Sequence, residues 1–495
     1  MRRAKCCLGS FSHTPAGKSR ARPRVGTNDR SRPKVANSRV LPEAASVVPL
    51  ITSCCDRIVT SRISLPLALC LLAVLLSSPA CKRPTKRRPG AETKAKPAAI
   101  RSVALTPQPA QARATAALVA RGKQLVAQYQ CNRCHAGSGH GTPPLAKNCV
   151  GCHAEILADR FPPAGKVKPD VVAKWKREIV DLTMAPSLTS TGARVRRAWL
   201  AKFLQRPHDL RPKLSATMPR FVIDAEAARA IAAYLAPQAA PATSAVEGDL
   251  RHGRAVLAAK GCMTCHTFSG LPSPVDATQI PVKLSAEATT RGIMLAPDLR
   301  HARERLRYDT LVAWLREPTK LKRDSAMPDL KLSAAEARDA AAFILRAYLA
   351  PAKLPTVPAR LPLLKRAVSW AEVEKKLFKR ICWHCHSEPA YARGDGGPGN
   401  TGGFGFKPRG VNLASYEAVA SGRLDDKGER ESLFRPLASG PLKGVPRIAA
   451  VLLARQREVS GKPVPGLRGM PLGLPPMSPQ DIQLVESWVA QGRPR

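Results

Sequence analysis

The 495-residue sequence predicts an all-α protein of three tandem helical domains that follow a secretory leader. Three observations lead to this prediction. Alanine-rich segments that begin with good helix N-cap residues recur along the chain. The order of short motifs in residues 112–237 returns in residues 247–350, which indicates an internal repeat. The 46 prolines and few aromatic residues suit small helical domains joined by proline-rich links, and the third domain is expected over residues 366–495.

Residues 1–81 form the predicted leader. An apolar run over residues 65–76 follows two arginines and precedes small residues that end at Cys81, which is the order of a secretory signal. The run is too short to span a bilayer comfortably. Because the run lies far from the first residue, we expect translation to begin nearer Val59. Cys81 is a candidate lipid-attachment site and ordinary cleavage before it is the alternative; both place the protein in the periplasm or on the outer face of a membrane.

Residues 82–111 are basic and rich in proline and alanine, which predicts a linker. Beyond residue 81 the chain has 67 Lys and Arg against 33 Asp and Glu, a formal net charge of +34. A field this positive favours acidic partner proteins or an anionic membrane surface, and a diffuse solvated surface is the alternative. Export argues against nucleic acid as a partner.

The pentapeptide Cys-x-x-Cys-His occurs four times, at Cys131–His135, Cys149–His153, Cys262–His266 and Cys382–His386. It is the attachment signature of c-type haem, in which the two thiols bond to the porphyrin and the histidine is the proximal iron ligand. We therefore expect four covalently attached haems. The expected anchors are Cys131, Cys134, Cys149, Cys152, Cys262, Cys265, Cys382 and Cys385, and the expected proximal ligands are His135, His153, His266 and His386.

The cysteines have two other interpretations. The first two motifs together have roughly the spacing of a zinc ribbon, and paired cysteines also occur as disulfides. Neither explains why a histidine follows the second cysteine in all four copies, nor why the last two copies stand alone. The six remaining cysteines all lie at or before Cys81, so none is left for another role in the domains.

The first two domains share an ordered set of landmarks. A glycine precedes the motif by nine residues, and an Ala-Pro pair, a tryptophan, a Met-Pro pair and a capped helix with an aromatic residue follow it. The pairs are Gly122 and Gly253, Pro186 and Pro297, Trp199 and Trp314, Met218 and Met327, Asp224 and Ser333, and Tyr234 and Phe343.

This arrangement resembles the class I cytochromes c over most of residues 112–237 and 247–350. In that family the N- and C-terminal helices cross at a small residue, a proline loop supports the proximal histidine, and a late methionine binds the other face of the iron. The resemblance implies that Met218 and Met327 are distal ligands; a methionine that only fills the core is the alternative. The implied contacts are Gly122 with Tyr234, Gly253 with Phe343, Pro186 with His135, and Pro297 with His266.

The third domain departs from the repeat, because Val373 stands where the glycine is expected. Glycine-rich residues 394–405 have no phosphate-binding pattern and predict a flexible surface loop. The Met-Pro-x-Gly sequence at Met470, shortly before the last helix, resembles cytochrome c-like domains with a long central insertion. That resemblance implies that Met470 is a distal ligand and that Met477 packs in the core.

The Cys149–His153 motif has no landmark methionine of its own, because Met218 is assigned to the first haem. The candidates for its distal ligand are His208, Met184 and His140, each of which also has an ordinary structural interpretation. A five-coordinate iron, open to a ligand or a substrate, is the further alternative.

The sequence as a whole predicts an exported tetrahaem c-type cytochrome that carries electrons between respiratory partners through mostly His/Met-ligated haems. The alternative is a haem redox enzyme or its cytochrome subunit, similar to a dihaem peroxidase, that uses an open haem in the first domain. No flavin, copper or nucleotide motif accompanies the haem motifs, so no catalytic residue is expected. A zinc-binding interaction module remains only if the protein matures without haem.

Overall fold

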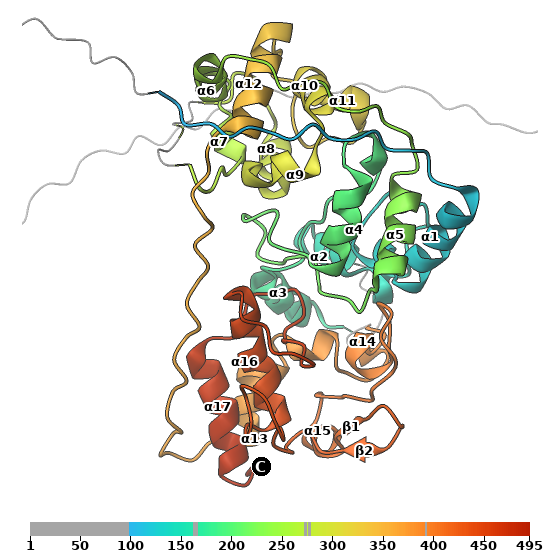
Figure 1. Ribbon diagram of the computed structural model, residues 1–495. Helices are drawn as coiled ribbons and strands as arrows, with labels where there is room; N and C mark the ends of the chain where they lie inside the picture. The colour runs from blue at the N-terminus through green and yellow to red at the C-terminus, as the bar shows by residue number, and fades with distance from the viewer. Residues whose placement is uncertain (1–98, 162–166, 272–274, 276–278, 392–393) are drawn as a thin grey trace, which may run out of the picture. The chain divides into compact units, whose positions relative to one another are not determined.

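The computed structural model describes residues 99–161, 167–271, 275, 279–391 and 394–495 (Figure 1). The chain divides into two units, Met1–Lys94 and Ala95–Arg495, and the described residues all belong to the second. This unit is mostly helical and has a single two-stranded sheet among its described residues, so the all-α prediction is confirmed at that level. The described helices include none that is both long and apolar enough to cross a membrane. The predicted secretory signal, Cys81 and residues 82–98 of the linker lie outside the described residues.

The first region, residues 112–237, is built on a crossing of its first and last helices. Its elements are α1 Ala116–Gln128, η2 Cys131–Arg133, η3 Leu145–Lys147, α2 Cys149–Leu157, α3 Pro169–Glu178, η4 Thr191–Ala193, α4 Arg197–Gln205 and α5 Ala225–Leu235. Helices α1, α4 and α5 lie together in Figure 1, and α5 contacts both of the others. A Cβ atom on Gly122 would lie 2.0 Å from the Ala230 carbonyl oxygen and 2.7 Å from the Tyr234 Cβ. The expected contact of Gly122 with Tyr234 is confirmed, and only glycine lets the helices approach this closely.

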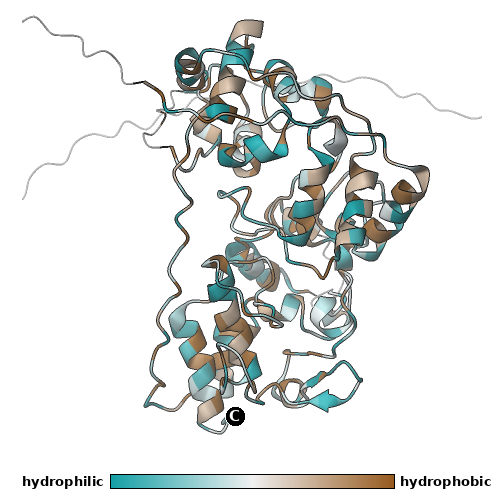
Figure 2. Cartoon of the chain, in the orientation of Figure 1, coloured by the Kyte–Doolittle hydropathy of each residue, from teal (hydrophilic) through white to brown (hydrophobic). Residues whose placement is uncertain are grey.

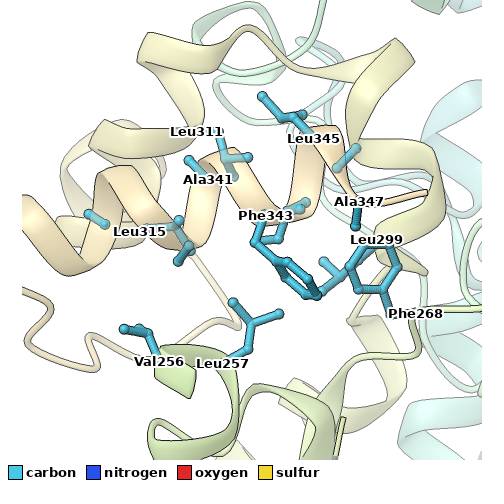
Figure 3. Packing of buried hydrophobic residues seen from close by; sticks show 14 of the residues in the cluster. Val256, Leu257, Phe268, Leu299, Leu311, Leu315, Ala341, Phe343, Leu345 and Ala347 are labelled. Atoms are coloured by element: carbon cyan, nitrogen blue, oxygen red, sulfur yellow. The ribbon is translucent and has the colours of Figure 1, made fainter. Parts of the chain in front are cut away.

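The second region, residues 247–350, repeats this crossing. Its elements are α6 Leu250–Ala259, α7 Cys262–Cys265, α8 Ala286–Leu295, η5 Leu299–His301, α9 Ala302–Arg305, α10 Tyr308–Arg316, α11 Pro318–Leu321 and α12 Ala334–Arg346. A Cβ atom on Gly253 would lie 2.0 Å from the Asp339 carbonyl oxygen and 2.9 Å from the Phe343 Cβ, as expected. Figure 3 shows the Phe343 ring reaching from α12 into the core, between Leu257 and Phe268.

The predicted N-caps of the two last helices are also present. Asp224 accepts a hydrogen bond from the Ala227 backbone N–H at 2.7 Å, at the start of α5. Ser333 accepts one from the Glu336 backbone N–H, and the Glu336 carboxylate accepts one in return from the Ser333 backbone N–H at 2.7 Å. The helix α12 therefore begins with a complete capping box, whereas α5 begins with a single cap.

The third region, residues 366–495, combines helices with the short sheet. Its elements are α13 Trp370–Val373, the π-helical segment η6 Glu374–Phe378, η7 Cys382–His384, α14 Gly397–Asn400, α15 Tyr416–Ala420, β1 Arg423–Leu424, β2 Arg430–Glu431, α16 Arg447–Val459 and α17 Pro479–Ala490. The strands are antiparallel and pair Arg423 with Glu431. Val373 and Trp488 are fully buried in the core where α13 meets α17. Polar and apolar residues alternate along α16 and α17 (Figure 2), as expected for helices with one buried side.

Residues 99–111, the described end of the predicted linker, are not a free tether. Ser102 pairs with Ala347 in an isolated β-bridge, and Gln111 pairs with Ala240. Ile100 packs against the core of the second region. The start of this segment is therefore bound to the second region before α1 begins. The composition of the segment does not predict these backbone hydrogen bonds.

Candidate functional site

The four motif histidines share one hydrogen-bonding arrangement. In each, Nδ1 lies against a backbone carbonyl oxygen: His135 on Pro186 at 2.7 Å, His153 on Asp181 at 2.8 Å, His266 on Pro297 at 2.8 Å and His386 on Val411 at 3.3 Å. A carbonyl can only accept, so Nδ1 carries the proton and Nε2 keeps its lone pair. Metal-binding histidines are oriented in this way, and the expected support from both prolines is confirmed.

The surroundings keep these rings neutral. Burial lowers the pKa of all four histidines, to about 4 for His266 and for His386, because loss of hydration disfavours the imidazolium. Neutral imidazole is the form that binds a metal ion. The local environment therefore suits a metal ligand at each motif.

A cavity of about 320 Å³ is shared by the first and second regions. Its walls include the complete first and third motifs, with Cys131, Cys134, His135, Cys262, Cys265 and His266. Met218 and Met327 line the same cavity. The fold thus brings each thiol pair and its histidine to the same space as the methionine that the sequence assigns to it.

The two methionines have different neighbours. The Trp314 indole N–H donates a hydrogen bond to the Met327 sulfur at 2.9 Å. The corresponding Trp199 of the first region lies near the carboxylate of Glu304 in the second region, whose pKa is lowered first by the hydrogen bond with His301 and last by Trp199. In the third region Met470 packs at the edge of the core, while Met477 is buried in it as predicted.

Three of the four arginines that line the same cavity are strongly desolvated, and none of the three belongs to a recognisable motif in the sequence. Burial lowers the pKa of Arg194 and Arg211 to about 10 and that of Arg305 to about 9, because each guanidinium is desolvated. Asp324 and Glu304 offset only part of this effect. Among the described residues, the Nε of Arg194 and of Arg305 have no hydrogen-bond partner. Buried cations so poorly paired favour an anionic group in the cavity.

The glycine-rich residues 394–405 are not a flexible surface loop; that prediction is wrong for their described positions. A Cβ on Gly399 would lie 2.0 Å from the His386 ring, and one on Gly397 would lie 2.4 Å from the Cys385 Cα. A Cβ on Gly405 would meet the Tyr129 ring at 2.4 Å. These glycines let the backbone pass directly behind the fourth motif and against the first region, a role that only close packing reveals.

Three of the four motifs meet at one place. The Cys134 and Cys149 thiols lie close together, and their interaction is the main reason why the pKa of Cys134 is raised and that of Cys149 is lowered to about 6. Burial, and secondarily the nearby Cys149, raise the pKa of Cys385. Arg133 donates two hydrogen bonds to the Asp395 carboxylate, at 2.9 and 3.0 Å, with side chains only 5% and 16% exposed. This buried ion pair joins the first motif to Asp395, nine residues after the fourth motif, and Cys149 of the second motif lies near both of its members.

The three candidates for the distal side of the second motif lie elsewhere. The half-buried His140 contacts the Lys123 carbonyl oxygen at 3.2 Å. Met184 and His208 line the cavity of the first and third motifs, and the His208 ring lies 4.1 Å from that of His301.

The ring that faces His153 is that of His384, a variable position inside the fourth motif. Their ring centroids are 6.0 Å apart and their planes are inclined by 85°. The sequence gives one signal for this residue: only the Cys382–His386 copy has a histidine between its two cysteines.

The cysteines give no support to the two other interpretations. Among the described residues, no disulfide joins any of the eight motif cysteines. Among the described residues, the group of three or more potential metal ligands within 4.8 Å of one another consists of His208, His301 and Glu304, with no cysteine in it.

No protein-family model, curated protein or solved structure matches this sequence. The motifs and their surroundings are therefore the grounds for any functional assignment.

Proposed function

We propose that this protein is an exported tetrahaem c-type cytochrome that carries electrons between respiratory partners. One observation supports it above the others: every Cys-x-x-Cys-His motif has its histidine anchored through Nδ1 to a backbone carbonyl, with Nε2 left for a metal. Haem iron, when bound at these histidines, supplies one-electron chemistry between its ferrous and ferric states.

The chain offers partners for each part of a haem group. The thiol pairs provide the covalent anchors and the histidines the proximal ligands, while Met218, Met327 and Met470 are the proposed distal ligands. The carboxylates of the haem propionates would pair with Arg194, Arg211 and Arg305, whose charges are otherwise poorly compensated. The residues present therefore fit the group.

The positions of the motifs support conduction along the chain. The third and first motifs line one cavity, and the first, second and fourth meet around Cys149. Haems anchored there would form a continuous series in the order third, first, second, fourth. The two outer haems of this series would exchange electrons with the partners.

The charge of the chain supports an acidic partner. A net charge of +34 beyond residue 81 would steer a negatively charged redox protein, or an anionic membrane surface, toward the cytochrome. Association should then weaken as ionic strength rises, because exposed charges are screened. Lipid attachment at Cys81 would add a membrane anchor.

The test is the haem content of the protein after export in a host with a cytochrome c assembly system. The pyridine haemochrome assay should give four haems per chain, and replacing both Cys149 and Cys152 with serine should give three. H252A, at a half-exposed histidine that belongs to no motif, is the control and should leave four. A protein without haem that binds zinc at its cysteines would overturn the proposal.

Carbon monoxide separates the carrier from the enzyme alternative. A carrier whose irons all have two protein ligands should bind no carbon monoxide in the ferrous state. Binding of one molecule per chain by the native protein would favour an enzyme that uses an open haem.

A further inference from the structure

The contact between His153 and His384 joins two motifs that are far apart in the sequence. His153 lies in α2, and its Nδ1 is held by the Asp181 carbonyl oxygen at 2.8 Å. His384 ends η7, and its Nδ1 is held by the Ile381 carbonyl oxygen at 3.2 Å. Both rings therefore keep the lone pair of Nε2, because each carbonyl can only accept a hydrogen bond.

The separation and inclination of the two rings are those of an edge-to-face aromatic pair, and the separation also fits two ligands on one metal ion. Imidazoles that bind a metal from opposite sides, at metal–nitrogen distances of about 2 Å, have ring centres about 6 Å apart. The centroids of His153 and His384 are 6.0 Å apart. Two rings in plain van der Waals contact can come closer, as His208 and His301 do at 4.1 Å.

Aromatic neighbours hold His384 in this position. The Trp383 ring stacks on His384 with centroids 3.8 Å apart, and Trp175 of α3 stacks on Trp383 at 6.4 Å. The His384 ring nevertheless remains exposed on part of its surface. Because Trp383 covers one side of the His384 ring and the other side is accessible, the ring can bind a group placed beside it.

We propose that His384 binds the iron of the haem attached at Cys149 and Cys152, on the face opposite His153. This inference rests on the proposed function, since it assumes a haem at the second motif. The second site would then have two histidine ligands and would be complete only when the third region supplies one of them. His/Met ligation raises the reduction potential of a haem, so the second haem would have a lower potential than the other three.

The proposed ligand also defines the route between two haems. His384 immediately precedes Cys385, an anchor of the fourth haem. The iron of the second haem and the edge of the fourth would thus be linked through adjacent residues of one short helix. Electrons would pass between the first and third regions of the chain at this point.

The test uses the full-length protein with its haem content measured first. Four haems per chain establish the proposed function independently, and near-infrared magnetic circular dichroism then reports the ligands of each iron. The wild-type protein should show one bis-histidine haem and three His/Met haems. Absence of any bis-histidine signal would overturn the inference about His384 and leave the tetrahaem assignment intact.

Variants of His384 give the decisive comparison. H384A should lose the bis-histidine signal and bind one carbon monoxide per chain, and added imidazole should restore the signal. H384M should retain four haems and convert the second site to His/Met ligation with a raised potential, which keeps the test valid should H384A mature poorly. H208A and H140A are matched controls and should keep the wild-type spectrum. A bis-histidine signal that persists in both His384 variants, or that disappears in H208A, would refute the assignment.

Discussion

The first and second regions build the same helix crossing from the same residues, yet they differ in what surrounds it. Gly122 and Gly253 each bring two helices into backbone contact, and Pro186 and Pro297 each hold a motif histidine. In the second region, however, the tryptophan position of the repeat is filled by Trp314, whose indole N–H donates a hydrogen bond to Met327 of the same region. In the first region, the corresponding residues contact the other two regions.

The outward contacts of the first region are made by residues that the repeat does not specify. Arg133 lies between its motif cysteines and pairs with Asp395 of the third region, whereas Thr264 stands at the equivalent position in the second. Trp199 lies near Glu304 of the second region. The repeated helix crossing thus places the motif histidine in the same way in both regions. The residues between the repeated positions determine which other regions each one contacts.

The ion pair that only the first region has should contribute most to stability. D395N should lower the free energy of unfolding by about 3 kcal/mol, because it leaves the buried Arg133 charge without its partner. Urea unfolding of the full chain, followed by circular dichroism, measures this. The control is D426N, at an exposed pair with Arg409, which should leave the free energy of unfolding almost unchanged. Equal effects of the two variants would mean that the Arg133 pair is not a structural anchor.

The two glycines should behave alike, since the crossing is common to both regions. G122A and G253A should each cost about 1–3 kcal/mol, because the added methyl group overlaps a backbone carbonyl of the opposite helix. Thermal unfolding of the two variants and of G141A provides the measurement. A Cβ on Gly141 would meet no atom within 4 Å, so G141A serves as the control. A stable G253A beside an unstable G122A would show that the two crossings are not equivalent.

Replacing each tryptophan should show whether its indole affects the reduction potential of the haem that the nearby methionine is proposed to bind. Under the proposed function, W314F should lower the potential of the third haem by about 40 mV, the equivalent of one hydrogen bond of about 1 kcal/mol. The reason is that the Met327 sulfur, freed of its donor, stabilises ferric iron more strongly. Spectroelectrochemical titration measures the shift. W199F removes no donor from Met218 and is the matched control; an equal shift in both variants would contradict this account.

The capping box of α12 should have the weakest effect. The pKa of Glu336 is lowered, first because its carboxylate accepts the hydrogen bond from the Ser333 backbone N–H. A lowered pKa in the folded state adds stability above the unfolded pKa of about 4.3, and this stability is lost as the pH falls through the folded value. E336Q should therefore cost about 0.5 kcal/mol at pH 7 and almost nothing at low pH.

Thermal unfolding of E336Q and the wild-type protein at both pH values measures this effect. In the first region Ala227 stands at the equivalent position, so A227G and the wild type should differ by the same amount at both pH values. A pH-independent effect of E336Q would exclude the carboxylate as its cause.

Much of the fold and of each motif follows from residues close together in the sequence. The N-caps Asp224 and Ser333 act on backbone groups three residues away, and the helix crossings need only a glycine and an aromatic residue at set positions. The support of His135 and His266 by the two prolines also follows from the repeat. These features are predictable because local geometry and one shared crossing determine them.

Other features depend on contacts between distant segments. Residues 394–405 carry glycines because the backbone must pass close to His386 and Tyr129, whereas their composition alone suggests a surface loop. The cavity arginines Arg194, Arg211 and Arg305 form no pattern in the sequence. These three arginines share one feature: each guanidinium is buried with little charge compensation. This feature arises only when the regions pack together.

The amino-acid sequence specifies four Cys-x-x-Cys-His motifs in a mostly helical chain with two matching helix crossings, because thiol spacing and helix caps are local properties. Which motifs become neighbours depends on tertiary packing, which places Arg133 against Asp395 and His384 opposite His153. The physical reason is separation along the chain. Each pair joins residues more than 200 positions apart, and no local periodicity can specify a partner at that range.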